Sequence, residues 1–489
     1  MKKSLLLLGL ALGIFFTACD EDDDQVISYN VPEISTSTYE VEEGLSVDVS
    51  FDVTADAGYS SSSVSATNGS AEITSTPAAG ATSGTVTVTF TASDAGAGSV
   101  VLSVVDAEGQ TSTSTAVITI AAELTEIEVT DNITENTTWE YGKTYILTTR
   151  IAVEEGATLT IEPGVIVKGE AGTGTSASAL IIARGADIVA EGTADLPIIF
   201  TSVADEIDYD DIEAGNFASP NLDSETNGLW GGLIVLGYAP VSVSGDGETA
   251  QIEGIPTSDS NGLYGGSDAS DASGSLKYIS IRHGGTNIGE GNEINGLSLG
   301  GVGTGTEISH IEIVSNQDDG IEFFGGSVSV SDVVVWNVGD DGLDTDQAWT
   351  GNVDNFVVIT SAGHCFELDG PEGSLEGAHS FTNGYVVATS YDSDGEVDRF
   401  CEDLVNADAN SAFSMSNVYF TSINDQTIDA DVFDVATLSN IVLNVEEADL
   451  LSYLEDQTEV PASITAGTTN TVDFTAFTWT WANEAGVLD

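Results

Sequence analysis

Apolar and polar residues alternate in short runs between residues 31 and 122. Stretches such as YEVEEGLSVDVSFDV, GTVTVTFTAS and TAVITI place every second side chain on one face, and Gly, Asp and Ser separate them. A period of two indicates strands with one buried face. About seven such runs predict a small immunoglobulin-like β-sandwich that acts as a spacer. A carbohydrate-binding sandwich is the alternative, but no aromatic cluster in this segment supports it.

From about residue 125 the pattern changes to longer repeating units. GATLTIEPG at 156–164 and GADIVAEGT at 185–193 align at a spacing of 29 residues. Further along, apolar residues recur every 22 or 23 residues in two parallel series, namely Ile311, Val333 and Phe356, and Ile313, Val335 and Val358, with Val418 and Ile441 continuing at 23. Such units predict an all-β fold in which residues 125–489 form a right-handed parallel β-helix, with coils about 4.8 Å apart.

Two segments rich in Asp, Ser and Gly interrupt this repeat, at about 203–228 and 244–273. We expect both to be loop insertions on the outside of the coil. A tryptophan at a coil position is more often in the core than on a sugar-binding face, and this expectation applies to Trp230, Trp336 and Trp349. Near the end of the chain, we expect Trp479 and Trp481 to close the last coil and cover its strand edge.

The first residues, MKKSLLLLGLALGIFFTAC, have the pattern of an export signal. Lys2 and Lys3 precede an apolar run, residues 5–16, that is too short to span a bilayer, which predicts a signal peptide over residues 1–18. The residues before Cys19 resemble a lipobox, which implies cleavage at Cys19 and attachment of lipid to it. Two or three acyl chains give stable membrane anchoring, whereas one is marginal. An ordinary secretory signal is the alternative.

Residues 19–30 continue with the acidic run Asp20-Glu21-Asp22-Asp23-Asp24, which predicts a solvated tether. This run is similar to the acidic export signal of Bacteroidetes lipoproteins. The similarity implies that the protein is anchored in the outer membrane and faces the cell exterior.

Charge and cysteine content limit the partners. The chain has 80 acidic and nine basic residues, and removal of residues 1–18 leaves a formal charge of −73. Such a charge excludes nucleic acid as a partner and favours a medium that screens it or cations that bind to it. Two cysteines follow Cys19, and Cys365 and Cys401 are either disulfide-bonded or two separate buried thiols.

Six motifs in the C-terminal part resemble a family of Bacteroidetes surface lipoproteins within the pectate-lyase-like β-helix superfamily. They are TLTIEPGVIVKG (158–169), GLWGGLIVLGYAP (228–240), YGGSDASDASGSLKYISIRHGG (264–285), GNEINGLSLGGVGTGT (291–306), DDGIEFFGG (318–326) and DDGLDTD (340–346). The resemblance implies the β-helix fold but not one function, because the fold hosts lyases, hydrolases, adhesins and passive stalks.

The repeat stacks acidic residues from successive coils. It places Asp319, Asp341 and His364 in one column, Glu322, Asp344 and Glu367 in a second, and Asp346 with Asp369 in a third. Two carboxylates one coil apart repel by about 0.9 kcal/mol in water and about 3.5 kcal/mol at an effective dielectric of 20. Ca²⁺ is the cation that suits dense carboxylates without soft ligands, so we expect it here. Turn acids that point into solvent are the alternative.

Three turns also resemble the motifs of polygalacturonases: Asn316-Gln317-Asp318, Gly339-Asp340-Asp341 and Gly363-His364-Cys365. The resemblance implies an inverting glycoside hydrolase with Asp318, Asp340, Asp341 and His364 as its catalytic residues. The match is incomplete, because Cys365 replaces a glycine and no Arg-Ile-Lys motif follows. A lyase is disfavoured further, since the acidic chain would repel polyuronate.

The sequence therefore favours a lipid-anchored surface protein that acts as a binding or structural module. Its expected partners are the membrane, through Cys19, and a polysaccharide or surface proteins, with Ca²⁺ as the cofactor. An enzyme that acts on polysaccharides, more readily a hydrolase than a lyase, is the alternative function.

Overall fold

A computed structural model describes residues 28–121, 125–286, 294–392 and 394–488. The chain divides into two units, Met1–Leu124 and Thr125–Asp489. The signal peptide, Cys19 and most of the tether lie outside the described residues, so those assignments stay predictions. No helix in the described part of the chain is long and apolar enough to cross a membrane.

The first unit is a sandwich of two four-stranded sheets, with eight strands among its described residues. Every second residue of these strands is buried, as alternation predicts, and Phe51 and Phe90 are fully covered. The immunoglobulin-like assignment of the sandwich stays a prediction. One sheet has the order β1 (Glu33–Thr36), β3 (Ser46–Thr54), β6 (Ser83–Ala92) and β5 (Gly69–Ser75), and the other β2 (Tyr39–Glu42), β8 (Thr111–Ala121), β7 (Gly96–Asp106) and β4 (Tyr59–Thr67).

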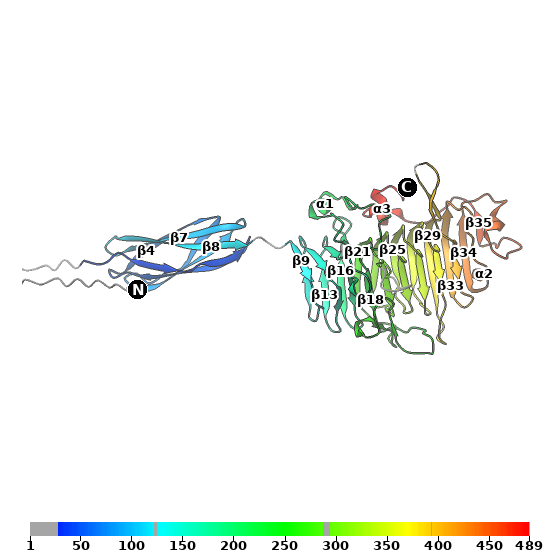
Figure 1. The fold of residues 1–489 in the computed structure, drawn as a ribbon, viewed down its shortest axis with the longest axis horizontal. Coiled ribbons are helices and arrows are strands. Elements are labelled where there is room, and N and C mark those ends of the chain that lie inside the picture. The colour runs from blue at the N-terminus through cyan, green and yellow to red at the C-terminus, as the bar shows by residue number, and fades with distance from the viewer. Residues whose placement is uncertain (1–27, 122–124, 287–293, 393, 489) are drawn as a thin grey trace, which may run out of the picture. The chain divides into compact units, whose positions relative to one another are not determined.

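The second unit is a parallel β-helix, as predicted, and its strands stack side by side in chain order (Figure 1). One wall is an eight-stranded parallel sheet with one strand from each of eight successive coils. Its strands are β12 (Arg150–Val153), β15 (Ala179–Ile182), β18 (Leu233–Leu236), β22 (Leu297–Gly300), β24 (Ile321–Phe324), β26 (Leu343–Asp346), β28 (Phe366–Leu368) and β32 (Asn406–Ala407).

The remaining walls form a second, 15-stranded parallel sheet. Its ladder pairs Ile311 with Val333 and Val333 with Phe356, so the predicted repeat is confirmed. Its main path is β9 (Glu126–Val129), β11 (Thr144–Leu147), β14 (Ile166–Gly169), β17 (Ile198–Ser202), β21 (Gly274–Arg282), β23 (Glu307–Val314), β25 (Val330–Trp336), β27 (Asn352–Ile359), β29 (Ala378–Val387), β33 (Ala412–Thr421), β34 (Ala436–Leu443) and β35 (Ile464–Ala466), joined by β10 (Thr137–Trp139), β13 (Thr158–Ile161) and β16 (Asp187–Glu191).

The expected three short strands per coil occur only in the first coils. From β21 onward, two of the three merge into one long strand that bends where the ladder skips a residue. The skipped residue has a left-handed backbone, with φ between 54° and 58° in every case, which Asn and Asp adopt at little steric cost. These residues are Tyr278, His310, Asp332, Asn355, Asn383, Asn417 and Asn440.

Insertions occur near both predicted places. Between β17 and β18 lies helix α1 (Tyr209–Ala214), and between β18 and β21 lie β19 (Ala250–Gln251), η2 (Ser260–Gly262) and β20 (Leu263–Tyr264). Tyr264 and neighbouring apolar side chains of the second insertion pack on outward-facing residues of the eight-stranded sheet. The remaining small elements are η1 (Gly174–Ser176), the hairpin β30 (Thr389–Tyr391) and β31 (Val397–Phe400), α2 (Val432–Val435), η3 (Leu450–Tyr453), η4 (Phe474–Phe477) and α3 (Trp481–Glu484).

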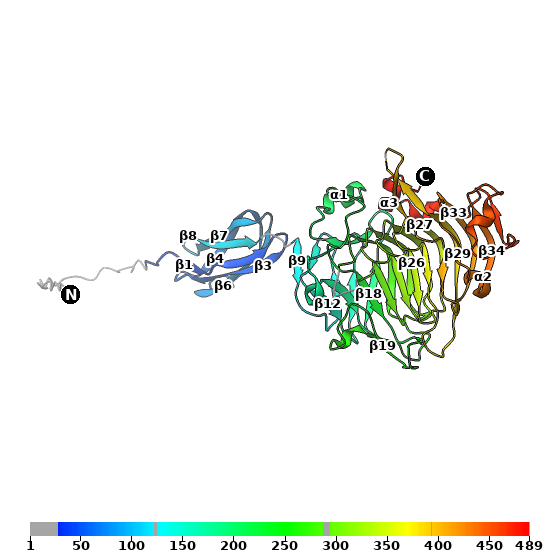
Figure 2. The same ribbon diagram turned by 45° about the vertical axis from the view of Figure 1, so that its right-hand side comes forward.

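The expectation that Trp479 and Trp481 close the last coil is wrong. The C-terminal segment folds back along the coil, and α3 lies over the middle of the long sheet in both views (Figures 1 and 2). Trp481 packs edge-on against Trp336, and the Ala482 N–H donates to Glu312 Oε1 at 2.9 Å. An apolar patch and a buried carboxylate on the outer face of the sheet therefore hold the segment there. Trp230, Trp336 and Trp349 are buried, as expected.

Candidate cation site

A column of polar residues lies where each turn enters a strand of the eight-stranded sheet. Because Leu297, Ile321 and Leu343 pair in register, the side chains two positions before them stack on successive coils. The Asp341 N–H donates to Asp319 Oδ1 at 2.8 Å, which ties two of these turns together. The column contains Asn295, Asp319, Asp341, His364 and Asp403, and it includes the three members that the sequence predicts.

A second column lies on the outer face of the same strands. Glu322 pairs with Asp344, and Asp344 pairs with Glu367, as predicted. Strand alternation sends their neighbours Ile321 and Leu343 into the core, so the acidic side chains face outward. Ser298 precedes these acids in the ladder and Asn406 follows them.

Three carboxylates from the two columns form one buried group. One oxygen from each of Asp319, Glu322 and Asp344 lies within 4.8 Å of the others, and these residues are only 6%, 7% and 8% exposed. Burial is the largest cause that raises the pKa of each carboxyl group well above its usual value, and the neighbouring acids raise it further. No Lys or Arg contributes to these pKa shifts. The group therefore concentrates negative charge without a cationic partner on the protein side.

Two buried oxygens beside this group have no hydrogen-bond donor among the described residues, namely Asp344 Oδ1 and Asn295 Oδ1. The Asn295 amide nitrogen is engaged, since it donates to Glu322 and, at 3.3 Å, to the Ser298 hydroxyl. A buried oxygen without a partner is costly, by about 1–3 kcal/mol. Carboxylate and amide oxygens are the ligands that Ca²⁺ takes in proteins, so this set fits a hard divalent cation.

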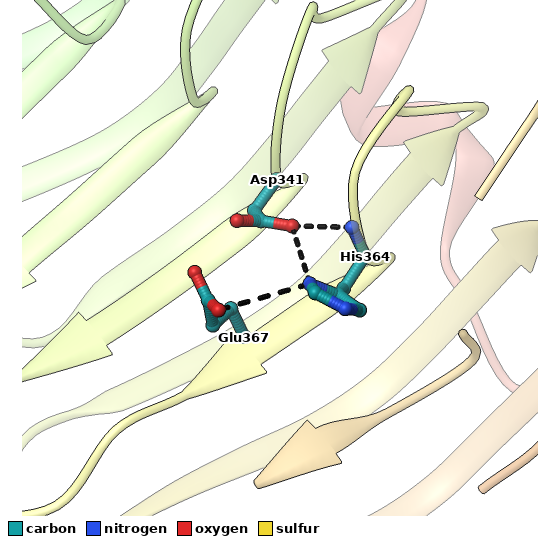
Figure 3. A group of neighbouring side chains, drawn as sticks. All are labelled: Asp341, His364 and Glu367. Atoms are coloured by element: carbon teal, nitrogen blue, oxygen red, sulfur yellow. Dashed lines mark hydrogen bonds and ion pairs between the residues drawn. The ribbon is translucent and has the colours of Figure 1, made fainter. Parts of the chain in front are cut away.

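Asp341, His364 and Glu367 form a second group, and their side chains point toward one another (Figure 3). His364 Nδ1 lies 3.0 Å from Asp341 Oδ1 and 3.8 Å from Glu367 Oε1, while its Nε2 lies 3.8 Å from Asp403 Oδ2. The hydrogen bond with Asp341 is the main cause that raises the pKa of His364 to about 9. Burial, followed by the hydrogen bond with Asp341, raises the pKa of Glu367 to about 8.

The remaining predicted ligands lie at the margins of these groups. Asp318, Asp319 and Asp340 bring one oxygen each within 4.8 Å of one another, and Asp340 is exposed. Burial raises the pKa of Asp346 to about 7 and also raises the pKa of Asp369. Asp346 Oδ1 accepts a hydrogen bond from the Gln347 N–H at 2.6 Å, so this carboxylate is already engaged.

Cys365 and Cys401 form a disulfide, with their Cα atoms 5.5 Å apart and both residues fully buried. This settles the alternative that the sequence left open. The bridge links the coil that carries His364 to the base of the hairpin β30–β31. Cys401 follows β31 directly, and the Glu402 N–H donates to the Gly363 carbonyl at 2.7 Å.

Sequence reasoning missed Asn295 and Asp403, which extend the first column at its two ends. A signal for both is present, because NGLS, DGIE, DGLD, HCFE and DLVN align from residues 295, 319, 341, 364 and 403. Asn295 precedes Asp319 by 24 residues, within the spacing range of the other units. Asp403 was missed because the hairpin lengthens its coil to 39 residues.

A family model described as a pectate-lyase-like β-helix domain matches residues 131–214 and 217–481. No curated protein matches the chain. Among solved structures, the chain is similar to a family 28 exopolygalacturonase from Yersinia enterocolitica, at 10% sequence identity with 90% of this chain and 97% of that chain covered. The TM-score of this pair is 0.16, which is too low to indicate anything about activity. Since the family model spans most of the sequence, the chain belongs to the family of pectate-lyase-like β-helix domains.

Proposed function

We propose that the protein is a lipid-anchored module on the bacterial surface whose β-helix binds Ca²⁺ and acts in binding rather than in catalysis. The observation that carries the proposal is the group of Asp319, Glu322 and Asp344, three buried carboxylates on neighbouring coils. Ion pairing within the protein does not neutralise this group, so a bound cation or protons must do so.

Calcium fits this group better than other common cations. The candidate ligands are carboxylate and amide oxygens only, without sulfur or imidazole, and such a set disfavours Zn²⁺ and Cu²⁺. Ligands on successive coils vary in distance and angle. Ca²⁺ tolerates this variation with its flexible geometry, whereas Mg²⁺ demands near-octahedral ligation. The Asn295 amide oxygen adds a fourth ligand from the preceding coil.

The membrane attachment rests on the sequence. Cys19 follows a signal peptide and a lipobox-like segment, and the acidic run at 20–24 resembles the signal for surface export. A lipid at this position would tether the protein outside the cell, where free calcium is abundant. Polysaccharides and surface proteins are the partners that we propose for the module.

Hydrolysis of polysaccharide is the second candidate function. The raised pKa of Glu367 favours it, because a carboxyl group with a pKa of about 8 is protonated at neutral pH and can act as a general acid. The spacing argues against it, since the grouped oxygens of Asp341 and Glu367 lie within 4.8 Å, whereas inverting hydrolases separate their carboxyl groups by about 6.5–9.5 Å. Release of reducing sugar that Asp341→Asn abolishes would favour the hydrolase.

Calcium titration of the purified full-length protein tests the proposal. We expect calcium to bind in calorimetry and to raise the melting temperature above that in EDTA, by about 2.7 kcal/mol of stability at a free concentration 100 times Kd. Asp344→Asn removes a ligand charge without changing side-chain size, so it should abolish both effects. Asp425→Asn, an exposed acid in a later turn, is the matched control and should retain them.

The alternative of protonated or solvated acids makes the opposite prediction. In that case calcium and EDTA give the same melting temperature and calorimetry detects no binding, and Asp344→Asn changes stability equally in both media. That result would exclude the calcium proposal.

A further inference from the structure

A pocket of about 480 Å³ lies on the β-helix unit, apart from the acidic columns. Three chain segments that are distant in sequence form it: residues 194–195 between β16 and β17, residues 212–217 at the end of α1, and residues 478–479 of the C-terminal segment. Its volume lies within the range of about 300–1,000 Å³ that is typical of small-molecule sites.

The floor of the pocket is apolar and fixed in place. Ile212, Phe217 and Trp479 line it and are buried. The Trp479 ring packs edge-on against Tyr278, with ring centroids 5.6 Å apart. The Phe217 N–H donates to Glu484 Oε2 at 3.0 Å, so α3 holds the insertion against the C-terminal segment. The aromatic floor is therefore supported from outside the pocket rather than by a ligand.

The rim is polar and carries only negative charge. Asp195, Glu213 and Thr478 line it and are exposed, and none of the lining residues is Lys, Arg or His. Ionised carboxylates accept hydrogen bonds but donate none. An anionic ligand such as a uronate or a phosphate would meet two like charges here, on a chain of net charge −71.

Trp479 adds the opposite requirement. This residue is only 2% exposed, and its indole N–H donates to no acceptor among the described residues. An indole nitrogen is a donor only, so a matching ligand must offer it an acceptor. An organic ammonium ion satisfies the carboxylates but cannot accept from Trp479. A hydroxyl group does both, because it donates to a carboxylate and accepts from an N–H.

We propose that this pocket binds an uncharged sugar ring, with the apolar face of the ring against Trp479 and Phe217 and its hydroxyl groups toward Asp195, Glu213 and the indole N–H. The assignment deepens the proposed binding function by naming a ligand class. The pocket shares no residue with the acidic columns, so sugar binding there does not require calcium.

The experiment titrates the full-length protein, in EDTA, with the methyl glycosides of glucose, galactose, mannose and N-acetylglucosamine. Methyl galacturonate and glucosamine serve as the charged probes, and saturation-transfer NMR with calorimetry is the readout. We expect at least one neutral glycoside to bind and the uronate to fail. Trp479→Phe keeps the ring but removes the N–H, so affinity should fall about two- to tenfold, as expected for loss of one hydrogen bond.

Two rim variants keep the test independent of folding in the core. Glu213→Gln and Asp195→Asn alter exposed side chains and should weaken binding by a similar factor. Glu206→Gln, an exposed acid on the same insertion outside the pocket, should leave affinity unchanged. The proposal is overturned if no neutral glycoside binds, if only glucosamine binds, or if the pocket variants bind as well as the wild type. A protein that binds sugar in EDTA but never binds calcium would refute the calcium site and leave this pocket standing.

Discussion

Glu322 of β24 and Asp344 of β26 are direct partners in the parallel ladder, and both side chains are buried. A parallel ladder brings residues at the same coil position to about 4.8 Å, so a repeat that conserves an acid also stacks like charges. Burial raises the pKa of both carboxyl groups well above the usual value, and repulsion between them adds to the effect. The protein must supply protons or a cation to this pair, and pH distinguishes the two.

We predict that stability without calcium falls as the pH rises from 5 to 8.5. The pKa of Asp346 is raised to about 7 and that of Glu367 to about 8, whereas unfolded carboxyl groups titrate near 4. Between these values the folded state holds protons that the unfolded state has lost, so the free energy of unfolding decreases with pH. His364 acts in the same direction, because its raised pKa of about 9 favours folding at lower pH.

Urea unfolding in EDTA at pH 5, 7 and 8.5 measures this dependence. A decrease of roughly 2–4 kcal/mol is expected, after a discount for the partial exposure of Glu367. Saturating calcium should remove most of the decrease, since the cation replaces the protons and binds better as they leave. Stability that is flat or rises over this range would show that the acids are already ionised and solvated.

The repeating parts of the fold were predictable from sequence. The spacing of Ile311, Val333 and Phe356 predicted the ladder, and it also predicted the stacking of Glu322 on Asp344, because one register governs the inner and outer faces of a strand. The left-handed bend that merges two strands was not predicted. A single residue such as Asn355 in that conformation replaces a turn, and Asn also occurs in many ordinary turns.

The parts that depend on contacts between distant segments could not be read from the repeat. The return of the C-terminal segment depends on Glu312, whose burial is not visible in the alternating pattern of β23. The pocket beside Trp479 likewise needs three segments that no local pattern connects. Asp403 lies in register with His364 only once the hairpin is set aside as an insertion.

The disulfide gives a second prediction. Replacement of Cys365 and Cys401 by Ala should reduce the free energy of unfolding by about 4 kcal/mol, since their sequence separation of 36 residues defines a loop whose closure entropy has that size. Urea unfolding of the double variant, beside the wild type with and without reductant, measures the change. The oxidised wild type should exceed both other samples equally. If reductant leaves the wild type unchanged while the double variant is weakened, packing of the side chains explains the loss instead.

The buried ion pair under the C-terminal segment gives a third. Arg282 Nη2 lies 3.7 Å from Glu312 Oε2, and both side chains are almost fully buried. Glu312→Gln leaves the arginine charge without its partner and should destabilise the protein by about 3–5 kcal/mol. The matched control is Glu307→Gln on the same strand, where an exposed pair with Lys277 contributes about 1 kcal/mol or less. Equal losses in the two variants, measured by urea unfolding, would contradict the role assigned to Glu312.

The lipid anchor gives the last prediction, and it rests on the sequence at residues 16–24. Cys19→Ala removes the thiol that would carry the diacylglycerol, so the variant should not incorporate labelled fatty acid and should leave the membrane fraction. Replacing the five acidic residues at 20–24 with Asn and Gln should keep the lipid but reduce cleavage by protease added to intact cells, because it removes the charge proposed to direct surface export. Cys401→Ala lies far along the chain and controls for loss of a cysteine as such. Fatty-acid labelling that persists in Cys19→Ala would place the lipid elsewhere, and unchanged surface cleavage of the 20–24 variant would leave the acidic run as a simple tether.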